Sequence, residues 1–215
     1  MNKLVLAAAV LALAATPARA DDDDKPLSQH MEFIERGDVL TVTTNITKLF
    51  DSSAYQALSS GFVTNVELHI WVYSSDSNDI VAETLVHRSI VYDMWDEDYT
   101  IKLCDACKPI TVKSPAEGLK LMTTIDQLAV ANLAAIPYGD PQTNLYYLAL
   151  RADLNPVDKK TLTEVRRWLS QSSGGGLDRG STFFGSFVSV FVNPKIAEAD
   201  RVLRVRSQPF YRPKP

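Results

Sequence analysis

Apolar and polar residues alternate along much of the first half of the chain, and this alternation predicts β-strands. In the segment 39–47, Leu40, Val42 and Ile46 are separated by threonine and asparagine. A period of two with β-branched residues is typical of a strand with one buried face. The same pattern predicts strands at 62–73, 80–92, 99–103, 110–112, 145–154 and 196–211. The strand at 62–73 would turn Phe62, Val66, Leu68, Ile70 and Val72 toward a core.

Helix signals are fewer than strand signals. Asp51 or Ser52 would cap a short helix that Gly61 ends. Ser114, which is followed by a proline and then a glutamate, predicts another helix start. We expect two short helices between there and about residue 135, and an amphipathic helix over 155–169.

The order of these elements indicates the fold class. Strands that follow one another as hairpins do not form alternating βαβ units, so a parallel doubly wound sheet is disfavoured. We expect a mainly β fold: an antiparallel β-sandwich of about seven strands, of the immunoglobulin-like class, with a few short helices. It would form a single domain over 32–215, whose C-terminal extension contains a flexible linker at 170–180.

The first twenty residues have the pattern of a cleavable signal peptide. Lys3 precedes an apolar run from Leu4 to Ala15, and small residues stand at Ala18 and Ala20. The run is too short to cross a bilayer, which needs about 20 residues, and no later stretch is long enough. We therefore expect cleavage after Ala20 and a mature protein in the periplasm or outside the cell.

The net charge of the chain limits the classes of molecule that we expect it to bind. Removal of residues 1–20 leaves 20 basic and 26 acidic side chains, a formal charge of −6. This balance argues against nucleic acid as a partner. The new N-terminus would begin with four aspartates and Lys25, which predicts a disordered acidic arm over 21–31. The same letters occur as a protease-cleavage tag, and a weak calcium site is a further interpretation.

Three segments carry a resemblance to a known family. They are Leu58–Tyr73 (LSSGFVTNVELHIWVY), Ile90–Leu103 (IVYDMWDEDYTIKL) and Tyr146–Asn155 (YYLALRADLN). Together they resemble an uncharacterised family of exported proteobacterial proteins that is classed as a domain of unknown function. The resemblance covers roughly residues 39–169. It implies an exported β protein and assigns no activity.

The two cysteines are the first place where chemistry could reside. Cys104 and Cys107 are separated by two residues and lie between two predicted strands. In an oxidising compartment this arrangement favours a structural disulfide that closes a hairpin turn. A redox-active thiol pair is the alternative. Haem attachment would need a histidine after the second cysteine, and zinc would need two further ligands.

Acidic and aromatic residues form a second cluster. Asp93, Asp96, Glu97 and Asp98 lie among aromatic residues. A solvated turn is the favoured interpretation, while acid–base chemistry on sugars or calcium binding are alternatives. We expect neither metal nor cofactor here. Together with two aromatic residues of the preceding hairpin, this turn defines a candidate ligand surface: Trp71, Tyr73, Tyr92, Trp95, Asp96, Asp98 and Tyr99.

Two histidines lie on neighbouring predicted strands. His69 shares a polar strand face with Glu67 and Trp71, and His87 lies on the next strand, so the histidines are candidate cross-strand neighbours. A metal site or proton relay is one interpretation, and an ordinary half-exposed histidine is the favoured one. Farther along, Phe183, Phe184, Phe187 and Phe191 recur at helical spacing. Core packing is favoured for them, with a partner or membrane face as the alternative.

These observations give three hypotheses of function. The sequence contains no nucleophile elbow, phosphate-binding loop, dinucleotide fingerprint or HExxH motif. The leading hypothesis is an exported, non-enzymatic binding or structural module of the bacterial cell envelope that engages a protein or glycan. The first rival is a periplasmic thiol-redox protein using Cys104 and Cys107. The second is a calcium- or carbohydrate-binding module using the turn at 92–99.

The signal pattern makes a direct prediction. The exported protein should begin at Asp21, because Ala18 and Ala20 occupy the positions that a signal peptidase recognises. N-terminal sequencing of protein recovered from the periplasm or medium measures this. Exported material that still carries Met1 would contradict it.

Overall fold

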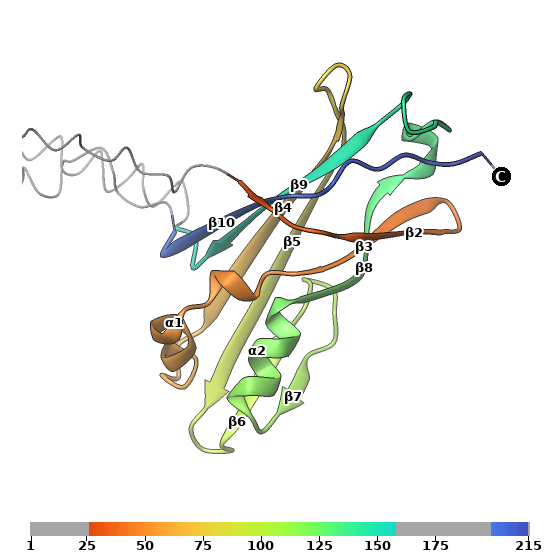
Figure 1. The fold of residues 1–215 in the computed structure, drawn as a ribbon. Coiled ribbons are helices and arrows are strands. Elements are labelled where there is room, and N and C mark those ends of the chain that lie inside the picture. The colour runs from red at the N-terminus through yellow and green to blue at the C-terminus, as the bar shows by residue number, and fades with distance from the viewer. Residues whose placement is uncertain (1–25, 158–198, 215) are drawn as a thin grey trace, which may run out of the picture.

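Two β-sheets dominate the computed structural model, which describes residues 26–157 and 199–214 (Figure 1). The larger sheet has seven strands in the order β1-β10-β9-β4-β5-β6-β7, and the smaller has three in the order β2-β3-β8. Neighbouring strands are antiparallel except β1 and β10, which are parallel. The larger sheet contains β1 (Leu27–Ser28), β10 (Arg201–Arg206), β9 (Tyr146–Leu154), β4 (Thr64–Ser74), β5 (Ile80–Asp93), β6 (Asp98–Lys102) and β7 (Ile110–Val112). The smaller contains β2 (Glu32–Arg36), β3 (Val39–Asn45) and β8 (Thr124–Asn132).

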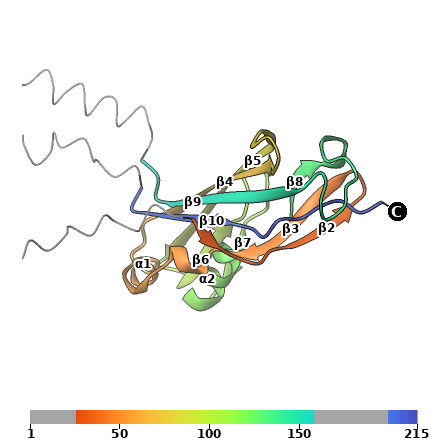
Figure 2. The same cartoon turned by 45° about the horizontal axis from the view of Figure 1, so that its top comes forward.

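Short helices and the smaller sheet lie together on one side of the larger sheet (Figures 1 and 2). Helix α1 (Ser52–Ala57) begins at Asp51, whose carboxylate accepts a hydrogen bond from the amide of Ala54 at 2.9 Å. This bond lowers the pKa of Asp51. Helix α2 (Pro115–Thr123) follows Ser114 and packs on β5, β6 and β7. Single 3₁₀ turns occur at η2 (Thr47–Leu49) and η3 (Leu133–Ala135).

The core fills the space between these two layers. Strand β4 shows how the sequence builds it: Val66, Leu68, Ile70 and Val72 are at most 1% exposed, while the residues between them are partly exposed. The alternation predicted for this strand is therefore confirmed. Phe62 is an exception, because it precedes β4 and is 79% exposed rather than in the core.

The mainly β fold is confirmed, with differences in its details. Ten described strands form one mixed and one antiparallel sheet, where about seven antiparallel strands were expected. The immunoglobulin-like class stays a prediction. The second helix expected before residue 135 is absent from the described chain, and β8 occupies that segment. Its residues pair with residues of β3 that lie 79 to 93 positions earlier, so local sequence could not reveal the pairing.

The N-terminal boundary also differs from the expectation. Leu27 and Ser28 pair with β10, and Met31 is only 1% exposed, so the structured part begins before residue 32. The signal peptide, the aspartate run, most of the helix at 155–169, the linker at 170–180 and the phenylalanines at 183–191 lie outside the described residues. Among the residues that are described, no helix is long and apolar enough to span a membrane.

A buried arginine connects the larger sheet to helix α2. Arg88 points from the inner face of β5 and is 6% exposed. Its Nη1 donates to the carbonyl oxygens of Leu121, Met122 and Thr124 at 3.3, 2.9 and 2.7 Å. These carbonyls belong to the last turn of α2 and the start of β8, where the helix dipole is negative. Burial lowers the pKa of Arg88, and its Nε has no hydrogen-bond partner.

Removing this cation should destabilise the protein strongly. We expect Arg88→Met to lower the free energy of unfolding by about 3 kcal/mol, because it leaves buried carbonyl groups without donors. Urea unfolding followed by circular dichroism measures the change. Arg36→Met, at an exposed position of β2, is the matched control and should shift stability by less than about 0.5 kcal/mol. Equal effects of the two substitutions would contradict the role assigned to Arg88.

Candidate functional site

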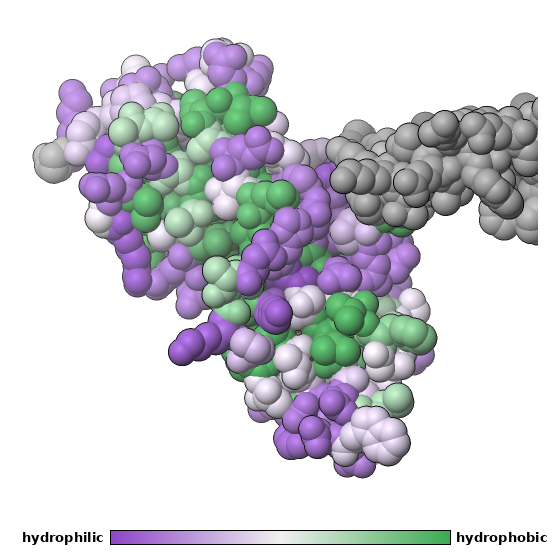
Figure 3. Space-filling view, turned by 180° about the vertical axis from the view of Figure 1, so that it is seen from behind, coloured by the Kyte–Doolittle hydropathy of each residue, from purple (hydrophilic) through white to green (hydrophobic). Residues whose placement is uncertain are grey.

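The outer face of the larger sheet, opposite the core, is the first candidate site. Because side chains alternate along a strand, the residues of β4 between the core positions point outward: Glu67, His69, Trp71 and Tyr73. No described helix or strand covers this face, since the helices and the smaller sheet lie on the other side (Figures 1 and 2). Viewed from that side, hydrophilic residues cross the face between apolar areas (Figure 3).

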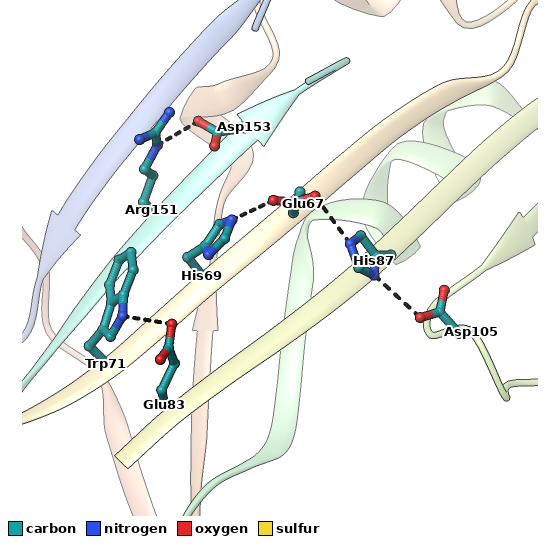
Figure 4. A network of polar contacts seen from close by, with 8 residues as sticks. All are labelled: Glu67, His69, Trp71, Glu83, His87, Asp105, Arg151 and Asp153. Carbon is teal, nitrogen blue, oxygen red and sulfur yellow. Dashed lines mark hydrogen bonds and ion pairs between the residues drawn. The ribbon is translucent and has the colours of Figure 1, made fainter. Parts of the chain in front are cut away.

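A chain of polar contacts runs across this face from β4 to the turn after β6 (Figure 4). Glu67 contacts His69 through Oε1 and lies 3.1 Å from Nε2 of His87 through Oε2. Nδ1 of His87 lies 3.3 Å from Oδ2 of Asp105. Glu67 and His87 are directly opposite in the strand register, whereas His69 is opposite Leu85. The histidines are therefore diagonal neighbours across the two strands, and they share the Glu67 carboxylate.

Metal coordination finds no support in this arrangement. Within residues 26–157 and 199–214, no three His, Cys, Asp or Glu side chains form a group that could hold a metal ion. Both carboxylate oxygens of Glu67 and both ring nitrogens of His87 are already engaged within the network. The network can fix the orientation of its members by hydrogen bonds, and it presents a structured polar surface.

Aromatic rings continue the outer face along β4. The ring of Trp71 stacks with that of His69 at a centroid distance of 5.6 Å, and its Nε1 donates to Glu83 on β5 at 3.1 Å. Tyr73 stacks with Tyr147 of β9 at 5.1 Å. Burial, together with the neighbouring Tyr147 and Glu83, raises the pKa of Tyr73. Stacking of this kind holds the rings in fixed orientations on the sheet surface.

Basic residues border the aromatic rings on the side of β9 and β10. The guanidinium of Arg206 lies 3.9 Å from the centroid of the Tyr147 ring, in cation–π geometry. Arg151 forms an ion pair with Asp153, with Nε and Oδ1 2.9 Å apart. Arg204 and Arg206 project from the same face of β10, because they are two positions apart on one strand. The face thus combines aromatic surface with groups of both charges.

The structure divides the predicted ligand surface. Trp71 and Tyr73 lie on the outer face, but Tyr92 and Tyr99 lie on the inner face, where their rings are 4.7 Å apart. Tyr99 is 3% exposed and its hydroxyl lies 2.7 Å from Oγ of Ser59. The remaining members, Trp95, Asp96 and Asp98, lie in or beside the turn between β5 and β6. The seven residues therefore do not form one surface.

Several residues of the outer face were not predicted to be part of the ligand surface. Glu83 lies on β5, Asp105 lies in the turn that follows β6, and Arg151 lies on β9. Trp71 is opposite Glu83 on one side, and His69 is opposite Arg151 on the other. The alternation within each strand signals which residues point outward. The pairing register, which decides which of them meet, follows only from the fold.

The cysteines close the turn between β6 and β7. Cys104 and Cys107 are joined by a disulfide, and the amide of Cys107 donates to the carbonyl of Cys104 at 3.1 Å. The prediction of a disulfide in a hairpin turn is confirmed. Asp105 lies within this turn and contacts His87. The disulfide therefore supports one end of the polar network on the outer face.

A hollow beside β2 is less suited to binding a ligand than the outer face of the larger sheet is. It has a volume of about 410 Å³ and lies between β2 and the C-terminal segment. The guanidinium of Arg212 is bonded there to Glu35 and to the carbonyl of Leu133, both at 3.1 Å. The two charged side chains of the hollow, Arg212 and Glu35, are therefore bonded to each other. The rest of its lining is largely apolar: Met31, Phe33, Leu40, Leu133, Ile136 and Phe210.

The fold and this face define a two-sheet β protein with a polar and aromatic sheet surface. The chain belongs to the family described as a domain of unknown function (DUF4390), whose model matches residues 27–172, more than half of the chain. The resemblance to a family of unknown function is thereby confirmed, whereas export and bacterial origin stay predictions. No curated protein and no solved structure matches this chain.

The disulfide should be structural and of modest energetic weight. Replacing Cys104 and Cys107 by serine should cost no more than about 2 kcal/mol, because so short a loop loses little entropy on closure. Thermal unfolding measures this cost. We expect that the rate of alkylation of the reduced protein, measured across pH, will give both thiols a pKa near that of a free cysteine, about 8.5. A strongly acidic thiol and a reduction potential near those of oxidoreductases would favour the redox hypothesis instead.

Proposed function

We propose that this protein is an exported, non-enzymatic binding module of the bacterial cell envelope. Its ligand is a protein or a glycan of the envelope, and the binding surface is the outer face of the larger sheet around Trp71. The signal pattern at 1–20 and the acidic mature chain support export. The outer face, which no helix or strand of the described residues covers, supports binding, because its polar and aromatic side chains hold one another in place.

One observation carries the proposal. Trp71 lies at the centre of the outer face, stacked on His69 and hydrogen-bonded to Glu83. An indole fixed in this way offers a rigid apolar plane beside carboxylate and guanidinium groups. Such a combination suits ligands with both apolar patches and hydroxyl or amide groups, which sugars and extended peptides share. Because the side chains are already ordered, little conformational entropy is lost when a ligand binds.

The polar groups of the network hold one another in fixed orientations, as suits a preformed binding surface. Here the Glu67 carboxylate lies between two histidines, and His87 lies between Glu67 and Asp105. The carbohydrate or calcium hypothesis at 92–99 is weakened because Tyr92 and Tyr99 face the core side of the sheet. The thiol-redox hypothesis is tested by the alkylation experiment above.

Binding to cell envelopes tests the proposal. The chain from Asp21 to Pro215 should co-sediment with envelopes isolated from a proteobacterium. Trp71→Ala should weaken that binding about tenfold, because a central aromatic residue commonly dominates an interface. Protease treatment of the envelopes distinguishes the two ligand classes: it abolishes binding to a protein and spares binding to a glycan.

A matched control separates a lost contact from general damage. Tyr55 is an aromatic residue on α1, 36% exposed and away from the outer face, so Tyr55→Ala should bind like the unmodified protein. Circular dichroism spectra should show that all variants remain folded. Binding that is unchanged by Trp71→Ala, or an absence of binding by the unmodified protein, would refute the proposal.

A further inference from the structure

A second, separate surface occurs where two neighbouring loops expose large apolar side chains at one end of the molecule. Phe62 and Val63 lie between α1 and β4, and Met94 and Trp95 lie between β5 and β6. Their exposed fractions are 79%, 53%, 65% and 93%, and Trp95 has the highest value among the large apolar residues of the described chain. We call these four residues the apolar tip. It lies at the lower end of the molecule in Figure 1.

The two loops of the apolar tip contact each other. Gly61 has a φ of +79° and lies against Met94: a methyl group added to Gly61 would be 3.5 Å from Cε of Met94. Pairing between β4 and β5 ends at Thr64 and Ile90, just inside the tip. The two loops therefore lie against each other, and they place four exposed apolar side chains at the same end of the β4–β5 hairpin. Large exposed apolar side chains that gather at one end of a molecule are candidates for an interaction site.

Hydrogen bonds hold the backbone that presents Trp95. The carboxylate of Asp93 accepts bonds from the amides of Trp95 and Asp96 at 2.8 and 3.3 Å. Lys113 donates to the carbonyl of Asp96 at 2.8 Å. Glu97 has a φ of 52°, which completes the tight turn. Trp95 is therefore exposed on a structured turn, and its indole remains in water although burial would stabilise it.

The rim of the apolar tip is acidic. Asp93, Asp96, Glu97 and Asp98 surround Trp95 in sequence, and Lys113, 3.6 Å from Asp98, is the basic group paired with them. A surface with an apolar centre and a charged rim has the composition of a protein interface. The excess of carboxylates favours a partner of positive charge. It disfavours insertion into a bilayer with anionic lipids, whose surface potential would repel the rim.

We propose that the apolar tip is a docking site for a protein segment in which apolar residues are flanked by lysine or arginine. Trp95 and Phe62 provide the apolar contact area, and the carboxylates of the turn attract the basic flanks. This site is independent of the outer sheet face, so either proposal can fail without the other. The opposite end of the β4–β5 hairpin carries Asp76, Asp79 and the 53% exposed Ile80, and it provides a natural control.

A random peptide library tests the proposal without knowledge of the partner. The chain from Asp21 to Pro215 is used to select peptides, and the selected peptides are synthesised and titrated by calorimetry. We expect peptides with an aromatic or aliphatic centre and flanking lysine or arginine. Trp95→Ala should weaken their binding about tenfold or more, as expected for a hot-spot residue. Ile80→Ala should leave the affinity unchanged.

Charge substitutions test the role of the rim. Asp96→Asn combined with Glu97→Gln should weaken peptide binding several-fold at low salt and reduce its dependence on ionic strength. Asp76→Asn combined with Asp79→Asn is the matched control at the other end of the hairpin and should change neither. Trp95 is almost fully exposed, so its removal should leave the melting temperature unchanged and keep the binding data interpretable.

Three results would overturn the proposal. The first is a set of selected peptides without a basic excess, or with affinity that is independent of Trp95. The second is binding of the protein to vesicles of phosphatidylglycerol and phosphatidylethanolamine that Trp95→Ala abolishes, which would identify a lipid surface as the occupant. The third is self-association in sedimentation velocity that Trp95→Ala abolishes, which would identify a second copy of the chain.

Discussion

The contact between Arg88 and the last turn of α2 is the interaction on which the arrangement of the layers depends. A guanidinium on the inner face of β5 donates to carbonyls of α2 and β8, so one side chain joins the larger sheet to the helix and to the smaller sheet. Removing a cation from water is costly, and the negative end of a helix offsets part of that cost. The same inner face carries the apolar core. Because the core lies on the inner face, the side chains of the outer face do not take part in core packing and can be polar.

That division between two faces explains the character of the candidate site. Strand β4 places aliphatic residues inward and Glu67, His69, Trp71 and Tyr73 outward, so one strand contributes to both core and surface. The outward residues contact neighbours on β5 and β9, and no helix or strand within 26–157 and 199–214 covers them. A sheet face organised in this way is rigid and remains accessible within the described structure. The apolar tip differs, because its four side chains are 53% to 93% exposed.

Local pattern predicted much of the strand architecture. The expected strands at 39–47, 80–92, 99–103 and 110–112 correspond to β3, β5, β6 and β7, and the capped helix at Asp51 is α1. These elements depend on alternation and capping, which are properties of adjacent residues. Strand β8 was not predicted because it pairs with β3, whose residues lie 79 to 93 positions earlier in the chain. The same limit applies to the site: Trp71 and His69 were assigned to one face, but Glu83 and Arg151 were not expected beside them.

The sequence by itself determined which residues of each strand share a face, where the disulfide turn lies and which turn carries exposed acids. These features follow from the period of two and from turn chemistry, both local. Only the tertiary structure decided that Glu67 lies between two histidines, that Tyr92 and Tyr99 turn away from Trp71, and that Gly61 meets Met94. Strand order and register settle such contacts, because a shift of one residue in pairing moves every side chain to the opposite face.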